Sequence, residues 1–180
     1  PIVSLPNADQ VKQALADCPL VIVSEVMADT DCTRVADVLL PAMGWSEKDG
    51  TVTNSERLIS RQRAVLPAAG EARPDWWALA QVAQKMGFVG FDYNHPHDVF
   101  VEHAALSAEQ NSDDQVRRDL NIAELATLSF EAYQNLLPVQ WGSKRFFAEG
   151  DFFTPNRRAR IVPVRVQATG YQPSRDYPFI

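Results

Sequence analysis

The sequence lacks any excess of positive charge, because 17 Lys and Arg residues stand against 23 Asp and Glu residues and give a net charge of −6. A nucleic-acid-binding surface needs a basic face that neutralises phosphates, so we expect no nucleic-acid partner. An apolar run of the roughly 20 residues that cross a bilayer is also missing, and we expect no membrane partner. The length of 180 residues suits one sizeable domain, and 46% apolar and 22% charged residues are ordinary for a globular protein.

Cysteine is scarce as well, since the chain has only Cys18 and Cys32, whose spacing matches no metal-binding motif. Two unpaired thiols are typical of a reducing compartment, so we expect a cytoplasmic protein; a disulfide between them is the alternative. The opening residues Pro-Ile-Val-Ser-Leu-Pro contain neither an initiator methionine nor a signal-peptide pattern. This opening indicates the start of an excised piece of a longer protein.

Several catalytic and binding motifs are missing too. No serine lies in a Gly-x-Ser-x-Gly context, which leaves a hydrolase triad without support. The three histidines, His95, His97 and His103, match no common zinc-ligand spacing. No Gly-rich phosphate loop follows an apolar strand, which disfavours an ordinary NAD site.

Strand and helix signals alternate over the first half of the chain. Residues 19–23 form an apolar run with β-branched side chains, which is typical of a parallel strand buried on both faces. A short helix that ends at Val35 and a second apolar run at residues 38–40 follow. This order predicts parallel pairing with a right-handed crossover, and therefore an α/β fold. Further helices are expected over residues 74–87, with Trp76 and Trp77 in the core, and near residues 97–106 and 129–137.

Polar side chains follow the two predicted strands, at the sheet edge where α/β proteins bind nucleotide-like ligands. Ser24 and Glu25 end the first strand. A carboxylate there accepts the two hydroxyls of a ribose, and the alternative is a solvated charge. Lys48 lies in the loop after the second strand, where an ammonium suits a pyrophosphate or a guanine carbonyl. Because Glu47 and Asp49 flank it, a surface ion-pair cluster is the alternative.

Two further residues have both a binding and a structural interpretation. Asn54, next to Ser55, supplies a short polar group that either binds a ligand or ends a strand. Asp75 opens a predicted helix, where the helix dipole alone stabilises a carboxylate. Its two oxygens also match the N1–H and N2–H donors of guanine, so the residue is a candidate for base recognition.

Four separated segments, residues 36–41, 47–57, 59–63 and 74–76, occur in an order that resembles one protein family. They are similar to the third domain of bacterial molybdopterin oxidoreductases, strongly over residues 1–90 and more weakly over residues 146–164. Residues 137–141 and 152–155 further resemble the assimilatory nitrate reductase branch, with formate dehydrogenases next. The resemblance implies a Rossmann-like three-layer α/β domain with a mainly parallel sheet.

The resemblance also implies a cofactor, molybdenum bis(molybdopterin guanine dinucleotide), and a 4Fe-4S cluster whose ligands lie outside this chain. It places Ser24 and Glu25 at a ribose, Lys48 at the nucleotide and Asp75 at guanine, with Asn54 as a further candidate contact. We assign no catalytic or metal-binding residue to this chain.

The implied organisation is a cofactor-binding domain over residues 1–166 and a linker over residues 167–180 toward a further domain. The expected partners are the rest of the same polypeptide and an unidentified redox donor. The implied activity is reduction of nitrate to nitrite by the whole protein, with the chain inactive alone. A formate dehydrogenase and a non-enzymatic nucleotide-binding domain are the alternatives.

Overall fold

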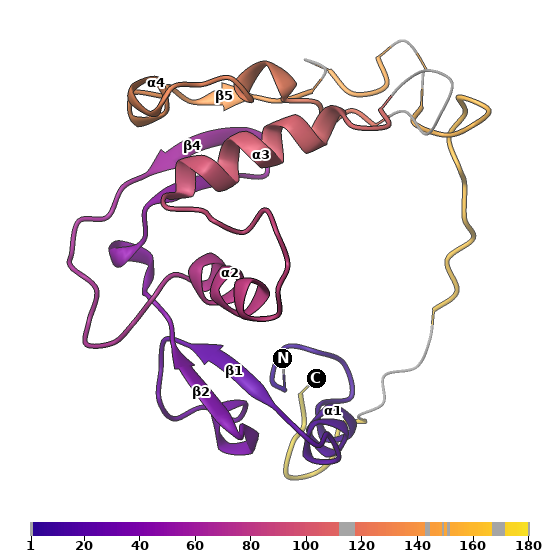
Figure 1. Cartoon of the computed structure of the whole chain (residues 1–180). Coiled ribbons are helices and arrows are strands. Elements are labelled where there is room, and N and C mark those ends of the chain that lie inside the picture. Colours follow the sequence, from indigo (N-terminus) through magenta and orange to yellow (C-terminus); the bar gives the residue numbers. More distant parts are fainter. Residues whose placement is uncertain are drawn as a thin grey trace.

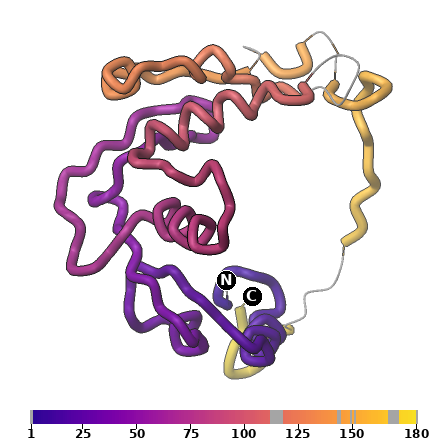
Figure 2. The backbone as a smooth tube through the Cα atoms, in the orientation of Figure 1, coloured from indigo at the N-terminus to yellow at the C-terminus, as the bar shows by residue number. Residues whose placement is uncertain are grey.

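Figure 1 shows the computed structural model of the chain, which describes residues 2–111, 118–142, 145–148, 150, 152–166 and 172–179. A parallel sheet lies near the chain ends, α2 lies in the middle, and an antiparallel sheet with α3 and α4 lies at the opposite end. The C-terminal segment returns toward α1 and the N-terminus (Figure 2). The elements in chain order are α1 (Ala8–Ala16), β1 (Ile22–Glu25), η1 (Thr33–Val35), β2 (Val38–Pro41), η2 (Trp45–Glu47), β3 (Gly50–Thr53), β4 (Leu58–Gln62), α2 (Asp75–Lys85), α3 (Pro96–Ala108), η3 (Ala123–Leu125), α4 (Phe130–Gln134) and β5 (Val139–Gln140).

The parallel pair confirms the predicted β-α-β unit. β1 and β2 run parallel with Ser24 opposite Leu40, and the 3-10 helix η1 lies in the crossover between them. Asp37 fixes the start of the pair, because its Oδ2 accepts the N–H of Val21 at 2.7 Å. The expectation that the first strand is buried on both faces is wrong, since Ile22 in β1 is exposed. Two strands alone bury little surface, and no described helix covers this pair on both sides.

The residues just before α2 pair with the carboxyl end of β2, and this pairing places the start of α2 there. The N–H of Arg73 donates to the carbonyl of Pro41 at 3.0 Å, and the N–H of Met43 donates to the carbonyl of Arg73 at 3.1 Å. The following Pro74 caps α2, which begins at Asp75 as the sequence predicts. Trp77 is exposed rather than buried in the core, because the helix turns this ring outward beside the Arg73 guanidinium.

The antiparallel sheet has the order β3-β4-β5. β3 and β4 form a hairpin in which Thr51 lies opposite Arg61, while Leu58 of β4 pairs with Gln140 of β5. α3 covers this sheet (Figure 1). The buried cluster of this half takes Ile59 from β4, Phe100 and Ala104 from α3, Ile122 and Leu125 from η3 and its N-cap, and Tyr133 from α4. The main hydrophobic core therefore belongs to the antiparallel half, where Ile59 anchors the β3–β4 hairpin to it.

The α/β class is confirmed, with one parallel and one antiparallel sheet among the described residues. The predicted helices near residues 97–106 and 129–137 correspond to α3 and α4. Part of the proposed linker, residues 167–171 and 180, lies outside the described residues. No described helix is long and apolar enough to cross a membrane.

Candidate functional site

Three of the residues singled out from the sequence meet at one point. The Ser24 hydroxyl donates to Oδ1 of Asp75 at 2.7 Å, and the Lys48 ammonium donates to Oδ2 of the same carboxylate at 2.8 Å. These side chains come from β1, from the residue after η2 and from the first residue of α2. We refer to Ser24, Lys48 and Asp75 as the Asp75 cluster.

The backbone explains why positions so far apart in the sequence converge. Ser24 lies in β1 beside β2, and the bridge from Ala42 to Arg73 extends the sheet on the other side of β2. That bridge places Asp75, two residues later, at the carboxyl end of the parallel pair. The cluster therefore lies at the edge where α/β sheets bind nucleotide-like ligands.

The flanking carboxylates of Lys48 have partners of their own. Glu47 accepts the N–H of Gly44 at 2.6 Å and the N–H of Ala69 at 3.0 Å, so it caps η2 and ties it to a neighbouring loop. Asp49 forms an ion pair with Arg61 at 2.9 Å. The interpretation of Lys48 as part of a local surface cluster with Glu47 and Asp49 is wrong, because its ion-pair partner is Asp75, 27 residues away.

The electrostatics of the cluster keep Asp75 ionised. The Lys48 ammonium, followed by the Ser24 hydroxyl, holds the pKa of the Asp75 carboxyl below its ordinary value of 3.8, although partial burial acts in the opposite direction. The side chains of Lys48 and Asp75 are 31% and 51% exposed. A carboxylate oxygen accepts more than one hydrogen bond, so an exposed Asp75 has free acceptor positions facing solvent. The cluster thus offers an anion, a cation and a hydroxyl to a polar ligand.

Glu25 lies next to the cluster at the end of β1 but bonds elsewhere. Its Oε1 accepts the N–H of Val26 at 2.8 Å. The residue helps to line a small cavity of about 140 Å³, which also includes Val23, Met27, Thr33, Leu39 and Pro41. Glu25 therefore keeps the strand-end position that the sequence predicts, and it borders a hollow between the ends of β1 and β2.

Asn54 is not brought into the cluster. It follows β3, whereas Lys48 precedes this strand, so the two residues lie at opposite ends of β3. Its Oδ1 accepts the N–H groups of Glu56 and Leu58 at 2.9 and 3.0 Å, which closes the β3–β4 turn. This geometry supports the structural interpretation of Asn54, and a cofactor contact through its amide nitrogen stays a prediction.

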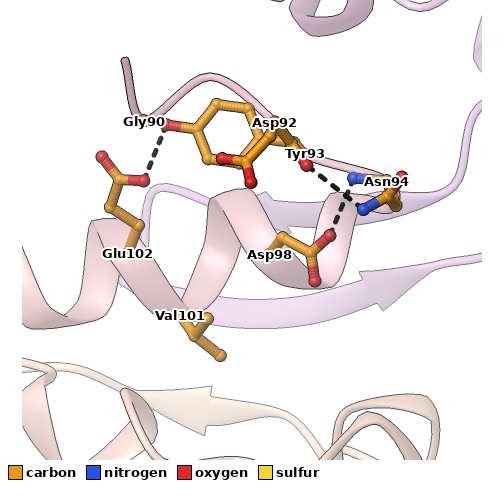
Figure 3. A pocket seen from close by; sticks show the side chains of 7 residues that line it. All are labelled: Gly90, Asp92, Tyr93, Asn94, Asp98, Val101 and Glu102. Atoms are coloured by element: carbon orange, nitrogen blue, oxygen red, sulfur yellow. Dashed lines mark hydrogen bonds between the residues drawn. The ribbon is translucent and has the colours of Figure 1, made fainter.

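A second hollow of about 600 Å³ lies at the start of α3 (Figure 3). Two of its carboxylates serve internal hydrogen bonds: Asp98 accepts the N–H groups of Asn94 and His95, and Glu102 accepts the Tyr93 hydroxyl at 2.6 Å. The Glu102 carboxylate raises the pKa of Tyr93 to about 12. No residue of the Asp75 cluster lines this hollow, which is bordered by Gly90, Asp92, Tyr93, Asn94, Asp98, Val101 and Glu102.

Two of the three histidines, His95 and His97, stabilise the start of α3. His95 Nδ1 accepts the N–H of His97 at 3.0 Å, and His97 Nε2 lies 2.8 Å from the carbonyl oxygen of Leu128. Among the described residues, no group of three or more His, Cys, Asp or Glu side chains is arranged to hold a metal ion. Sequence reasoning overlooked one buried charge near the site, Arg61, which a strand pattern alone does not distinguish from its exposed neighbour Arg63.

Comparison with known proteins adds independent information. Residues 1–85 match the family model described as molybdopterin oxidoreductase. The whole chain is 49% identical to a nitrate reductase of Klebsiella oxytoca and covers 21% of it. The whole chain is also 31% identical to the F420-dependent formate dehydrogenase subunit alpha of Methanocaldococcus jannaschii, of which it covers 25%. The chain therefore spans about a fifth to a quarter of the length of these relatives.

A solved structure supports the fold alone. The acetylene hydratase from Pelobacter acetylenicus superposes on 85% of this chain with a TM-score of 0.57 and 17% sequence identity, and the match covers 19% of that structure. The shared arrangement thus extends over most of the chain.

Proposed function

Because the chain belongs to the molybdopterin oxidoreductase family, which implies a molybdenum–pterin cofactor, we propose that the Asp75 cluster binds the guanine nucleotide end of that cofactor. The observation that carries the proposal is the convergence of Ser24, Lys48 and Asp75 at the carboxyl end of β1 and β2. In the proposed site, the two pterins carry guanine dinucleotides, and this chain holds one nucleotide end.

The donors and acceptors of the cluster fit a guanine nucleotide. The ionised Asp75 presents two oxygens to the N1–H and N2–H donors of guanine. Lys48 supplies a positive charge for a guanine carbonyl or a pyrophosphate oxygen, and charge-assisted hydrogen bonds of this kind are stronger than neutral ones. Ser24 and the neighbouring Glu25 supply a hydroxyl and a carboxylate for the ribose diol. The chain thus offers a complementary group to the base, to the ribose and to one carbonyl or phosphate oxygen of the ligand.

For the whole protein, we propose a molybdenum nitrate reductase that converts nitrate to nitrite. The 49% identity to a nitrate reductase over the whole chain supports this substrate. When bound, the molybdenum cofactor supplies the oxo-transfer chemistry, and a 4Fe-4S cluster held outside this chain supplies electrons. The chain contributes binding and orientation, with no catalytic residue of its own.

The proposal extends to architecture and location. We propose that strands from the rest of the polypeptide extend the β1–β2 pair into a Rossmann-like three-layer domain, and that an unidentified redox donor serves the assembled enzyme. The free thiols of Cys18 and Cys32 support a reducing, cytoplasmic location.

A formate dehydrogenase is the second candidate, favoured by the 31% identity to a formate dehydrogenase subunit over the same span. The cofactor site of this chain is the same under both candidates. Purified full-length protein distinguishes them, because a nitrate reductase reduces nitrate with a dye mediator and a formate dehydrogenase oxidises formate.

The site is tested by Asp75→Asn and Lys48→Met in the full-length polypeptide. We expect GMP released by acid, per mole of protein, to fall by about tenfold in each variant, because a hydrogen bond to a charged group is lost. Lys12→Met is the matched control, since Lys12 lies exposed in α1 and should leave the GMP content unchanged. The stability measured by urea unfolding should fall only slightly in the two site variants, by about 0.2–1 kcal/mol, the value of an exposed ion pair, and should not change in Lys12→Met. Full GMP content in both site variants would show that the cluster has another role.

A further inference from the structure

We propose that Arg61 is a positioning residue for the cofactor site, because it holds the two residues that follow Lys48 and thereby directs the Lys48 side chain at Asp75. The inference rests on the proposed function for its consequence in cofactor binding. Its structural part, the control of the Lys48–Asp75 ion pair by Arg61, is independent of any ligand.

Arg61 is the key buried cation near the site. Its side chain is only 1% exposed, although it carries a full positive charge near the end of β4. A buried charge is costly unless it is paired and hydrogen-bonded, so such a residue is expected to have a specific task. Its guanidinium donates hydrogen bonds to two other regions of the chain, the loop that follows Lys48 and the helix α4.

The first region is the loop that carries Lys48. The Arg61 guanidinium donates to both carboxylate oxygens of Asp49, at 2.9 and 3.2 Å, and to the carbonyl oxygen of Gly50. Asp49 and Gly50 directly follow Lys48 in the chain. Because both are tied to the same guanidinium, the backbone that leaves Lys48 has one defined direction.

The second region is α4, which belongs to the hydrophobic core. The guanidinium donates to the side-chain oxygen of Gln134 at 3.1 Å and to the Tyr133 hydroxyl at 3.3 Å, and it lies 4.1 Å from the centre of the Tyr133 ring. Tyr133 is completely buried in the core cluster. Arg61 therefore connects the buried core of the antiparallel half to the loop that reaches the parallel half.

This arrangement requires the shape of arginine. The planar fork of the guanidinium serves Asp49, Gly50 and α4 at the same time, whereas a lysine ammonium is a single point with no fixed plane. Arg63 follows two residues later and contacts the end of α4, where its guanidinium donates to the carbonyl of Gln134 at 2.6 Å. Because Arg63 is exposed and shares the α4 contact without the ion pair to Asp49, it is a matched control.

The test measures how accessible the Lys48 amine is in the full-length polypeptide purified without cofactor. Brief acetylation with acetic anhydride and mass spectrometry give the ratio of Lys48 to Lys12 modification, with Lys12 as the exposed internal reference. Asp75→Asn removes the ion pair directly and sets the upper limit of the ratio. We expect Asp49→Asn and Arg61→Met to raise the ratio about two- to fivefold, the range that corresponds to an exposed ion pair.

The variants separate positioning from a general loss of stability. Asp49→Asn preserves the size of the side chain, so it should fold even if Arg61→Met does not. Arg61→Lys should give an intermediate ratio, and Arg63→Met should leave it unchanged. An unchanged ratio in Asp49→Asn and Arg61→Lys, or an equal rise in Arg63→Met, would overturn the inference.

The GMP content of the same variants, loaded with cofactor, tests the link to the proposed function. We expect Asp49→Asn to lower it in the wild-type background and to have no further effect in a Lys48→Met background, because both changes act through one contact. Independent losses that add would contradict the positioning role. If the acetylation ratio rises but no variant, Lys48→Met included, loses GMP, then the proposed cofactor site is wrong and the positioning of Lys48 stands.

Discussion

Three carboxylates lie in or near the site, those of Glu47, Asp49 and Asp75, and each has a different role because each has different hydrogen-bond partners. Glu47 accepts two backbone N–H groups and fixes a turn, while Asp49 faces the buried Arg61. Asp75 instead bonds two side chains, Ser24 and Lys48, and its own side chain is half exposed to solvent. Only the third arrangement leaves a charged group both positioned and accessible, which is what ligand recognition requires.

Lys48→Met should raise the pKa of Asp75, because the Lys48 ammonium is the main cause of its lowered value. Ser24→Ala should raise the same pKa by less, and Lys12→Met should not change it. The measurement is the pH dependence of the Asp75 carboxyl carbon shift by NMR. Equal titration of Asp75 in the wild type and in Lys48→Met would contradict the ion pair.

The sign of the linked stability follows from the direction of this shift. A carboxyl whose pKa is lower in the folded chain contributes stability above its unfolded pKa, near 4, and loses this contribution as the pH falls through the folded value. The Asp75 contribution is therefore complete at neutral pH. Lys48→Met should reduce the difference between the stability at pH 7 and that at acidic pH.

At the scale of the elements, the two-residue strand β5 completes the antiparallel sheet. The chain that leaves β5 passes very close to an ion pair. Gly142, shortly after β5, has φ of 78° and lies against the ion pair between Arg57 and Asp119, whose side chains are largely buried. A Cβ at this position would overlap Oδ2 of Asp119 and lie 2.9 Å from Nη1 of Arg57. The same arginine donates to the carbonyl of Trp141 at 2.8 Å. Glycine thus lets the chain after β5 pass directly over the ion pair.

Gly142→Ala should lower the free energy of unfolding by about 2–4 kcal/mol, through the left-handed backbone and the displaced ion pair together. Gly90→Ala is the control, because Gly90 has a similar φ of 84° but has no atom within 4 Å of the position that an added methyl group would occupy. It should cost only the backbone part, about 1–2 kcal/mol. Urea unfolding of both variants measures the two free energies of unfolding. An equal decrease in both variants would show that the close approach of Gly142 to Asp119 does not contribute to stability.

At the scale of the whole molecule, local signals in the sequence predicted α2, α3, α4 and the parallel pair, and they placed Ser24 and Asp75 at the ends of their elements. They did so because capping residues, apolar periodicity and strand-end polar groups act over a few positions. β5 was not predictable in this way, since its pairing with β4 joins residues about 80 positions apart through only two residues. The burial of Arg61 was missed, because it depends on partners that only the folded chain supplies. For Asn54 the sequence left a binding and a structural interpretation open, and the hydrogen bonds of the folded hairpin support the structural one. The apolar composition of residues 19–23 also predicted that β1 is buried on both faces. Ile22 in β1 is instead exposed, because none of the described elements covers that face of the β1–β2 pair.

Like the β1–β2 pair, α2 has an exposed apolar surface. This surface is relevant to how the chain contacts the rest of the full-length polypeptide. Leu79, Val82 and Met86 are each more than half exposed, and their spacing places them on one side of the helix. The chain spans about a fifth of the length of its nitrate reductase relative, and we propose that other parts of the full-length polypeptide cover this stripe. Exposed apolar side chains that gather on one side of a helix are typical of an interface.

Leu79→Gln should therefore act differently in the two contexts. In the full-length protein it should lower stability by about 1.5–3 kcal/mol, the value of burying a leucine side chain, whereas in the 180-residue chain alone the change should be within about 0.5 kcal/mol. Lys85→Gln, at the end of the same helix, is the control and should be neutral in both. Thermal unfolding of the wild type and of both variants in each of the two contexts makes the comparison. A Leu79→Gln variant that is equally neutral in both contexts would mean that the α2 stripe faces solvent in the full-length polypeptide. The proposed contact between this chain and the rest of the polypeptide would then have to lie elsewhere.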